Sequence, residues 1–351
     1  MIAGMLALSL GAAKRGGLVY AVKMSPPVRL SDVARRAGVS VITASRALRL
    51  PGKVAPATRA RVAAAVAALG YVPNLVAGAL ASARTRNVAL LVPTVASSIF
   101  ASTINGLSEA LEAEGYAIVM AQSGYDSTRE DRALAALLGR RPEALVMVGS
   151  PATAAGQAML RRAAAEGTVV VETWDLPRRP VGAVVGFDNH EAGAAVAAHF
   201  AAAGRKRLAF LGGTDARATA RWQGFVAGCR RARLAAPRRV VLPAPAAMDD
   251  AAACASGSVI AGADAVFAAT DVHGVALLGA LRAAGRRVPQ DIALFGLGDL
   301  EIARHASPPL STVRIDGAAI GRRAAQLILA GADGARPIID IGFALIGRGT
   351  S

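Results

Sequence analysis

Side chains in two parts of this sequence have the types and spacing needed to bind ligands. Arg46 could form two parallel hydrogen bonds with a guanine base edge, and the nearby Val41 and Ile42 could contact only thymine methyl groups. The alternative for Val41 and Ile42 is that they pack into the protein interior. Far along the chain, Arg221 could fix a carboxylate through two parallel hydrogen bonds, as a sugar acid would need. These residues indicate binding of DNA and of a small anion.

The elements that would position Arg46 form a predicted helix-turn-helix. Apolar residues recur at helical spacing at Val33, Ala34 and Ala37. Gly38 then supplies a turn residue that tolerates positive φ, and Ser40 can cap a second helix over residues 41–48. After a loop at Pro51-Gly52-Lys53, a third helix is predicted at 58–69. The residues that would pack it on the first two helices are Val62, Val66 and Leu69. A generic helical hairpin is the alternative for the first stretch taken alone.

The positive charge of the chain is concentrated near its N-terminal end. Residues 1–86 contain 13 Lys or Arg and one acidic residue, Asp32, whereas residues 87–351 contain 27 basic and 23 acidic residues. Three quarters of the net charge of +16 therefore lies beside the predicted helix-turn-helix, as a phosphate-binding face requires. At 351 residues the chain is too long for one compact core, so we expect two or three domains.

The first residues and two uncharged runs bear on the cellular location. Residues 1–13 are apolar, but positive charge follows them, whereas it precedes the apolar part of a secretory signal. We therefore interpret residues 1–23 as a disordered leader or as lying before the true start at Met24. The runs 62–83 and 87–108 contain proline and polar residues that argue against membrane spans. A cytoplasmic protein with no membrane partner is expected.

From residue 87 onward, short β-rich runs alternate with alanine-rich amphipathic helices. This alternation predicts parallel sheets covered on both faces, with ligands bound at the carboxyl ends of the strands. The predicted strands are Val88–Val92, Ala117–Ala121, Leu145–Val148, Val169–Glu172, Ala183–Gly186, Leu208–Leu211, Ala265–Ala269 and Ile292–Phe295.

Motifs for catalysis and for cofactors are missing from the sequence. It has no phosphate-binding loop, nucleophile elbow or H-E-x-x-H motif, and Gly296-Leu297-Gly298 lacks the third glycine of a dinucleotide fingerprint. Cys229 and Cys254 are far apart and lack metal-ligand spacing, so they are most simply buried thiols in a reducing compartment. The four histidines are scattered. We expect neither an enzyme nor a bound metal or cofactor.

Polar and aromatic residues that follow predicted strands are candidates for ligand contacts. They are Ser97, Ser98 and Phe100 after the first strand and Glu172 and Trp174 after a later one. Glu172 would accept hydrogen bonds from sugar hydroxyls. The alternatives are structural: the two serines could cap the next helix, Arg221 could pair with Glu172 or Asp175, and the tryptophan could belong to the core.

The run S-D-V-A-R-R-A-G-V-S-x-x-T-x-S-R-x-L at residues 31–48, followed further on by T-R-x-R-V-x-x-A-x-x-x-L-G-Y-x-P-N, resembles the DNA-binding head of the LacI/GalR family. The resemblance implies that Val41 and Ile42 open the recognition helix, that Asn74 begins a hinge helix, and that Leu80 enters the minor groove and opens a base step. The implied DNA contacts are Ser31, Ser40, Val41, Ile42, Thr43, Ser45, Arg46, Arg49, Tyr71, Asn74 and Leu80.

The predicted hinge departs from the family pattern at two residues. Leu75 stands where a basic residue is common, and Gly78 lies inside the predicted helix. A glycine at such a position costs about 1 kcal/mol of helix propensity relative to alanine. A hinge helix that forms only on DNA would be weakened by this amount.

The resemblance covers nearly the whole chain and implies a multidomain protein. It has an all-α helix-turn-helix head and an α/β, periplasmic-binding-protein-like effector domain of two parallel-sheet subdomains. The expected boundaries are 24–72 for the head, 73–86 for the hinge helix and linker, 87–186 plus about 313–337 for the N-subdomain, and 187–312 plus about 338–351 for the C-subdomain.

Several runs are similar to the gluconate-operon repressor branch of the family, among them Ser97-Ser98-Ile99-Phe100-Ala101 and Val185-Gly186-Phe187-Asp188-Asn189. Arg221 matches the family's ligand-binding arginine, three residues before a glycine. The implied effector contacts are Ser97, Ser98, Phe100, Gln122, Glu172, Trp174, Arg221, Thr270, Asp271 and Gly298. Asp188-Asn189 and Asp271 could instead cap helices or form crossover turns. The family often has Asn-Asp where this chain has Thr270-Asp271, and an acid at Gly298, so at these two positions this chain lacks polar groups that the wider family uses for its ligands.

These observations predict a repressor that binds a pseudopalindromic operator as a homodimer and is released by a sugar acid such as gluconate. A second interpretation keeps the family but assigns a pentose, nucleoside or purine effector, including one that promotes DNA binding as a co-repressor. A third interpretation, a sugar-modifying enzyme with a basic N-terminal module, would require a set of catalytic groups that the sequence does not offer.

Overall fold

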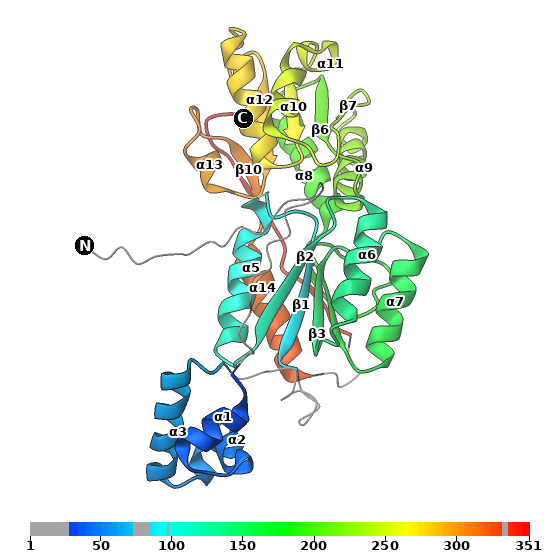
Figure 1. Ribbon diagram of the computed structural model, residues 1–351. Helices are drawn as coiled ribbons and strands as arrows, with labels where there is room; N and C mark the ends of the chain where they lie inside the picture. Colours follow the sequence, from blue (N-terminus) through cyan, green and yellow to red (C-terminus); the bar gives the residue numbers. More distant parts are fainter. Residues whose placement is uncertain (1–27, 73–84, 97, 332–335) are drawn as a thin grey trace, which may run out of the picture. The chain divides into compact units, whose positions relative to one another are not determined.

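Three helices form the DNA-binding head predicted from the sequence (Figure 1). They are α1 (Leu30–Ala37), α2 (Val41–Arg49) and α3 (Pro56–Leu69), with a 3₁₀ turn, η1, at Pro51–Lys53. Gly38 ends α1 in the left-handed conformation at φ 63°, and the Ser40 hydroxyl accepts a hydrogen bond from the Thr43 backbone N–H. Their small core consists of Val33, Ala37, Ala47, Val62 and Ala65. The helix-turn-helix prediction is therefore confirmed.

The computed structural model describes residues 28–72, 85–96, 98–331 and 336–351. The chain divides into two units, Met1–Ala77 with the head and Gly78–Ser351 with the effector domain. The predicted leader, the hinge residues Asn74, Gly78 and Leu80, and the candidate ligand contact Ser97 lie outside the described residues.

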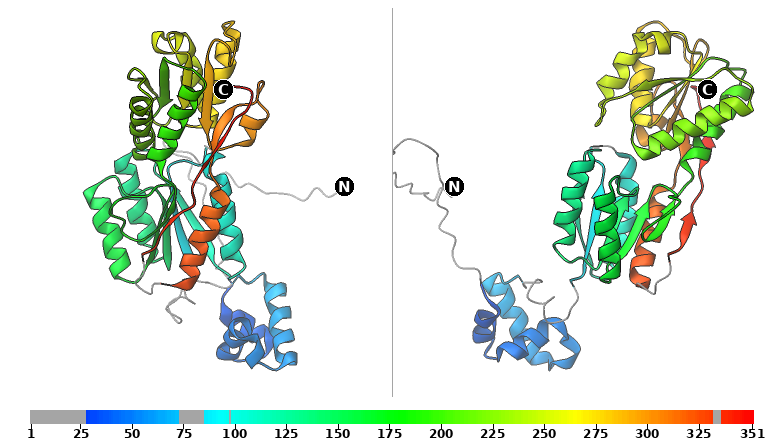
Figure 2. Two further views of the ribbon diagram at one scale, coloured as in Figure 1. Left: turned by 180° about the vertical axis from the view of Figure 1, so that it is seen from behind. Right: turned by 90° about the vertical axis from the view of Figure 1, so that its right-hand side faces the viewer.

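The effector domain contains two six-stranded sheets (Figures 1 and 2). The first sheet, with its helices, is the N-subdomain, and all its strands are parallel. In spatial order the strands are β11 (Ile338–Asp340), β5 (Ala183–Gly186), β4 (Val169–Thr173), β3 (Ala144–Val148), β1 (Asn87–Val92) and β2 (Ala117–Gln122). The helices are η2 (Ser98–Phe100), α5 (Ala101–Glu112), α6 (Ser127–Leu138), α7 (Ala154–Ala165) and α14 (Gly317–Ala330).

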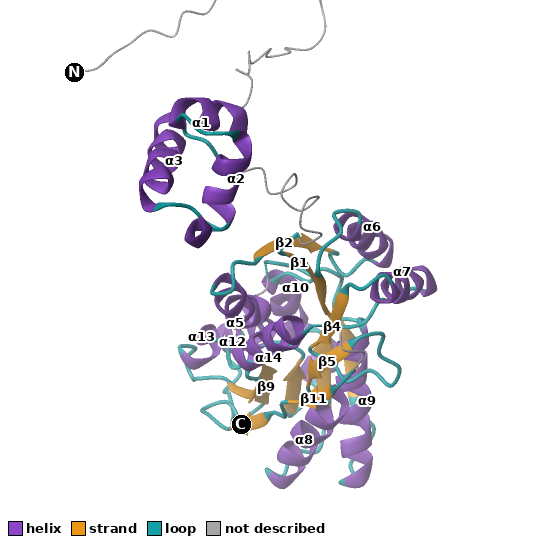
Figure 3. Cartoon of the chain, turned by 90° about the horizontal axis from the view of Figure 1, so that it is seen from below, coloured by secondary structure: helices purple, strands orange, loops and turns teal. Residues whose placement is uncertain are grey.

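Alternate residues of β1 show why helices cover both faces of this sheet. Val88 and Leu90 pack with Leu107 of α5 on one face, whereas Ala89 and Leu91 pack with residues of α6 and α7 on the other. Figure 3 shows α5 and α14 on one side of β1 to β5 and α6 and α7 on the other. The central strands are buried on both faces, which explains their uninterrupted apolar sequences.

The second sheet, with its helices, is the C-subdomain. Its strands in spatial order are β12 (Ala344–Ile346), β10 (Ser311–Arg314), β9 (Ala293–Leu297), β8 (Ala265–Ala268), β6 (Leu208–Gly212) and β7 (Arg238–Val241). Only β12 is antiparallel to its neighbour among these paired strands. Its helices are α8 (Asn189–Ala202), α9 (Ala216–Arg231), α10 (Met248–Ala253), η3 (Cys254–Ser256), α11 (Ser258–Ala261), α12 (Asp271–Ala283) and α13 (Glu301–Arg304).

The chain passes between the subdomains three times, after β5, after β10 and after β11. Two expected boundaries are wrong. Residues 313 and 314, expected in the N-subdomain, belong to β10 of the second sheet, and residues 338–340, expected in the C-subdomain, pair with β5 in the first sheet. Four strands are also missing from the prediction, β7, β10, β11 and β12. They have three or four residues each, and β7 and β10 contain basic or hydroxyl residues, so they do not give an apolar signal long enough to recognise.

The two long helices α8 and α9 approach each other closely through glycines. A Cβ atom on Gly224 would overlap the His190 carbonyl oxygen, and one on Gly193 would overlap the Arg221 carbonyl oxygen. These glycines therefore set the position of α9. Among the described residues, no helix is long and apolar enough to cross a bilayer.

Candidate functional site

The first residues of α2 form the exposed surface that sequence reasoning assigned to DNA. Val41 is 46% exposed and Ile42 is 71% exposed, so the alternative that they pack into the interior is wrong. Arg46, Arg49 and, on α1, Ser31 are also exposed. Exposed aliphatic side chains at the N-terminus of this helix can be covered by thymine methyl groups in the major groove.

Polar residues of α2 bond to one another in the unbound head. The Ser40 hydroxyl lies 2.9 Å from the Thr43 hydroxyl, and an Arg49 Nη2–H donates to the Ser45 hydroxyl at 2.8 Å. Tyr71 is half-buried against the core of the head. On DNA, these side chains would exchange their present partners for phosphate or base acceptors. Their DNA contacts stay predictions.

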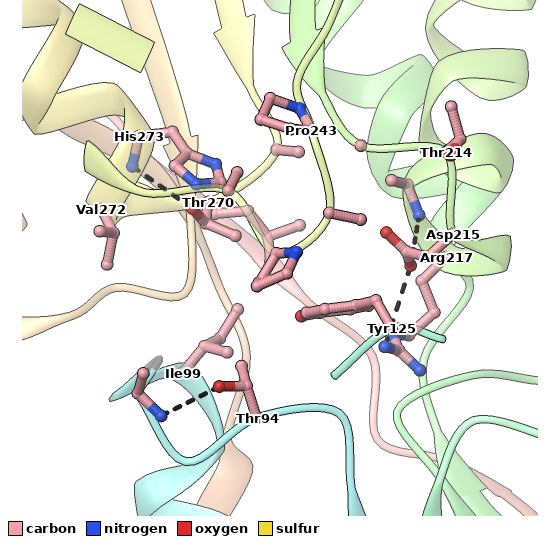
Figure 4. A pocket seen from close by; sticks show the side chains of 18 of the residues that line it. Thr94, Ile99, Tyr125, Thr214, Asp215, Arg217, Pro243, Thr270, Val272 and His273 are labelled. Carbon is pink, nitrogen blue, oxygen red and sulfur yellow. Dashed lines mark hydrogen bonds and ion pairs between the residues drawn. The ribbon is translucent and has the colours of Figure 1, made fainter. Parts of the chain in front are cut away.

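A cavity of about 420 Å³ lies between the two subdomains, within the size range of small-molecule sites (Figure 4). Its walls come from segments that follow the strands at their carboxyl ends, as the alternating pattern predicts. The N-subdomain contributes Thr94, Ala96, Ile99, Phe100, Tyr125 and Trp174. Opposite them, the C-subdomain contributes mainly Thr214, Asp215, Arg217, Arg221, residues 243–248, Thr270, Val272, His273 and Leu297.

Arg221 lines this cavity and is only 6% exposed. It donates a hydrogen bond from Nη1 to the Asn189 side-chain oxygen, whereas its buried Nε–H has no partner among the residues that the structure describes. Burial lowers the pKa of Arg221 to about 10, partly offset by the carboxylate of Asp215, so the guanidinium stays charged at neutral pH. The alternative that Arg221 pairs with Glu172 or Asp175 is not what the structure shows among the described residues. Glu172 has other partners, and Asp175 accepts a hydrogen bond from the Asn189 side chain.

Arg217 and Asp215 form the rest of the charged wall. Arg217 lies 3.8 Å from the Asp215 carboxylate, and its Cζ lies 5.8 Å from the centre of the Phe100 ring. Burial raises the pKa of Asp215, but the two neighbouring guanidiniums outweigh this effect and lower it below the ordinary value. The cavity wall therefore holds two guanidiniums and one carboxylate, a net positive charge that suits a monoanionic ligand.

Aromatic side chains form the facing wall. Trp174 follows β4, has φ 67°, and donates from its indole N–H to the Thr103 hydroxyl at 3.0 Å. The Phe100 and Trp174 rings meet edge to face, with centroids 5.2 Å apart. Burial raises the pKa of the Tyr125 hydroxyl, and the charge of Arg217 partly offsets this rise, so the hydroxyl remains a hydrogen-bond donor at neutral pH. These fixed rings can pack against the carbon skeleton of a sugar or against a planar base.

Five of the predicted effector contacts lie in the described chain but do not line the cavity: Ser98, Gln122, Glu172, Asp271 and Gly298. Glu172 accepts hydrogen bonds from the Ser150 hydroxyl and from the Val181 and Gly182 backbone N–H groups, so its carboxylate is structural. Gln122 accepts from the Val95 N–H. Asp271 is fully buried within the C-subdomain. Phe100, Trp174, Arg221 and Thr270 do line the cavity.

Sequence reasoning missed Thr94, Tyr125, Asp215, Arg217 and His273 as cavity residues. Each lies between the carboxyl end of a strand and the first turn of the next helix, so the carboxyl-end rule alone could have found them. Asp188 caps α8 by accepting from the Glu191 N–H, which agrees with the capping alternative. Asn189 instead bridges the subdomains, because its side-chain N–H donates to the Trp174 carbonyl oxygen at 2.9 Å.

Asp271 gives a pH-dependent prediction. Its carboxylate accepts hydrogen bonds from the Thr312 hydroxyl at 2.5 Å and from the Leu300 N–H at 2.7 Å. Burial raises its pKa to about 6 in spite of these bonds. For an acid with a raised pKa, the folded state binds the proton more tightly, so stability from this group is complete below pH 4 and is lost as the pH rises through 6.

The Asp271→Asn variant stays neutral at every pH. We therefore expect its unfolding free energy, minus that of wild type, to rise by about 2–4 kcal/mol when the pH is raised from 4 to 7.5, since each pKa unit corresponds to about 1.4 kcal/mol. Urea unfolding followed by tryptophan fluorescence checks this, because both tryptophans lie in the effector domain. Parallel pH profiles for the two proteins would contradict it.

The two sites define a DNA-binding protein that also holds a small ligand. Residues 29–74 match the bacterial regulatory proteins of the lacI family, and residues 197–350 match the periplasmic binding protein-like domain. The chain is 36% identical to an HTH-type transcriptional regulator named GntR from Pseudomonas aeruginosa, over 91% of this chain and 94% of the relative. A GntR regulator from Escherichia coli K12 is 30% identical over 92% of this chain and 98% of its own length.

Solved structures show the same arrangement. A LacI-family transcriptional regulator from Silicibacter pomeroyi is 31% identical and superposes with a TM-score of 0.84, over 92% of this chain and 99% of that one. The lac repressor dimer bound to operator, 23% identical, has the same fold with a TM-score of 0.77 over 92% of this chain and 99% of its own. The chain belongs to the LacI family and is a transcriptional regulator, as its relatives are, and not an enzyme.

Proposed function

We propose that this regulator is a dimeric repressor that leaves its operator when a sugar acid, such as gluconate, binds in the cavity. The observation that carries the proposal is Arg221, a buried charged guanidinium with an unpartnered Nε–H in the cavity wall. A ligand carboxylate would supply the missing acceptor and balance the net positive charge. The GntR-named relatives support this effector class, since the sequence resembles the gluconate-operon branch.

The remaining walls suit the rest of such a ligand. Thr94, Thr214 and Thr270 offer hydroxyl groups, and Phe100 and Trp174 offer apolar ring surfaces. The effector switches the protein only if it binds the DNA-bound and released arrangements with different affinity. Since the cavity draws on both subdomains, a ligand there favours one arrangement of the subdomains over others.

Relatives named for other ligands define the competing interpretation. A CelR regulator, 28% identical, has been solved as a complex with cellobiose, and repressors named PurR are 28% identical over 86% of this chain. The Phe100 and Trp174 rings could also stack on a purine. A neutral sugar or a purine is therefore the outcome that would replace the sugar acid.

The test begins with selection of an operator from a random DNA pool by the purified full chain. Melting temperature and operator affinity are then measured with gluconate, other aldonates, pentoses, cellobiose and purines. The proposal requires that an aldonate raises the melting temperature and weakens operator binding. A response to a neutral sugar or purine alone would overturn the sugar-acid assignment and leave the family unchanged.

The two side chains of the head that would contact bases, Arg46 and Ile42, differ in chemistry, and this difference gives a second prediction. Arg46→Ala should weaken binding to the selected operator by about 1–3 kcal/mol, since a bidentate pair with guanine would be lost. Ile42→Ala should cost less and relax selectivity at one base pair, with no loss of thermal stability because Ile42 is 71% exposed. Electrophoretic mobility shifts on selected and single-base-altered operators measure both effects. Equal loss on all sequences would show that Arg46 contacts only phosphates.

A further inference from the structure

One side chain of the C-subdomain reaches across the cavity wall into the N-subdomain. Arg217 belongs to α9, and its Nη1–H donates to the Val148 carbonyl oxygen at the end of β3, at a distance of 3.0 Å. The residue is only 9% exposed. Figure 4 shows Arg217 at the cavity wall beside Asp215, with Tyr125 of the N-subdomain close by. The bond therefore joins the two subdomains at the effector cavity.

Residues of the N-subdomain, Gly149 and Phe100 among them, leave a space that holds this guanidinium, and we call this space the slot. Gly149 follows β3 with φ 89°, and a Cβ atom there would lie 2.5 Å from Arg217 Nη1. The Phe100 ring covers the guanidinium, with Cζ 5.8 Å from the ring centre. A side chain at residue 149 would occupy this space, so the contact depends on glycine as much as on arginine.

The charges around Arg217 make the contact sensitive to an anion. Its acceptor on β3 is a neutral carbonyl, and the Asp215 carboxylate lies 3.8 Å from its Nη2. Arg221 lies four residues further along the same helix, and its positive charge repels that of Arg217. A carboxylate bound at Arg221 would offset this repulsion and favour the position of Arg217 in the slot.

We propose that Arg217 is an interdomain latch, which holds the two subdomains together across the cavity and is strengthened by the anionic effector. This inference rests on the proposed function only for the identity of the effector; the latch itself exists without ligand. Arg217 is thus a positioning residue that couples ligand binding to subdomain closure. Breaking the latch widens the range of subdomain arrangements and lets the ligand leave faster.

The test measures closure directly and without any effector. Spin labels are attached at Val95→Cys and Val241→Cys, two exposed residues on opposite subdomains, after Cys229→Ala and Cys254→Ala remove the native thiols. In the wild-type background we expect a narrow distance distribution. Arg217→Met should lengthen and broaden it. Arg230→Met, which removes an exposed arginine from the same helix, is the matched control and should leave it unchanged.

Two further variants separate a latch from a direct ligand contact. Gly149→Ala fills the slot but keeps the arginine, so it should lengthen the distance as Arg217→Met does; because alanine is also strained at φ 89°, the melting temperature of this variant is measured alongside the distance. Arg217→Lys keeps one donor and should give an intermediate distance. Unchanged distances in both Arg217→Met and Gly149→Ala would overturn the latch, whatever the effector panel shows.

With an effector from the panel, Arg217→Met should raise the dissociation rate about tenfold, the effect of losing one charged hydrogen bond. It should also reduce the ratio of operator affinities measured without and with effector. If no compound in the panel binds, the proposed effector class fails while the distance measurement still decides the latch. An unchanged affinity ratio in the variant would show that Arg217 does not couple the sites.

Discussion

Arg221→Ala is expected to raise the dissociation constant for the sugar-acid effector by about a hundredfold, because a buried charge-assisted pair typically contributes this much when one partner is removed. The variant should bind operator DNA as tightly as wild type and should no longer release it when effector is added. Isothermal titration measures the first effect, and operator binding with and without ligand measures the second.

The control for this result is Arg230→Ala, which removes an exposed arginine from the same helix and should change neither property. Arg221→Ala also leaves the Asn189 oxygen without its donor, so its melting temperature without effector must be measured. If the folded variant bound the effector with an affinity within threefold of wild type, the ligand carboxylate would not contact Arg221, and the proposed effector class would be wrong.

Helix α9 contributes both to the wall of the ligand cavity and to the packing of the C-subdomain. Arg217 and Arg221, one turn apart, line the cavity from the first half of α9, and Gly224 and Gly228 continue the same helix face, where α9 packs closely on α8. The spacing of an arginine three residues before a glycine therefore has a physical meaning. The glycine lets α9 approach α8, and this approach places the arginine in the cavity wall.

The sequence predicted the head more completely than the effector site for a physical reason. Helical spacing, Gly38 and Ser40 are local signals, and they specify a local structure of three helices. The eight predicted strands were also found, since their apolar runs are long enough to recognise. Contacts between residues distant in sequence carry no such signal. The pairing of β11 with β5 and the hydrogen bond that Glu172 accepts from Ser150 are both contacts of this kind.

The cavity shows the same limit. Sequence reasoning placed Glu172 in the site because it ends a strand, yet the side chain of that residue points to Ser150 and to two backbone N–H groups. Trp174, two residues on, lines the cavity instead. Alternation along a strand would place residues 172 and 174 on the same side, but Trp174 lies beyond the end of β4 and its φ of 67° turns the chain there, which no local pattern of the sequence indicates.

Gly224→Ala is expected to lower the free energy of unfolding of the effector domain by about 3 kcal/mol, since overpacking against rigid backbone is among the most destabilising changes. The new Cβ would overlap the His190 carbonyl oxygen, so α8 and α9 would have to separate. Arg221 would move with α9, and effector affinity should fall as well. Urea unfolding followed by tryptophan fluorescence reports this domain alone, because Trp174 and Trp222 both lie in it.

The matched control is Gly279→Ala on α12, where an added Cβ would meet no heavy atom within 4 Å. This exposed helical glycine should gain about 1 kcal/mol of stability on substitution, as alanine restricts the unfolded chain. The two glycine substitutions therefore shift the urea midpoint in opposite directions. If Gly224→Ala unfolded at the wild-type midpoint, α9 could shift without cost, and the close approach of the two helices would not be what fixes Arg221 in the cavity.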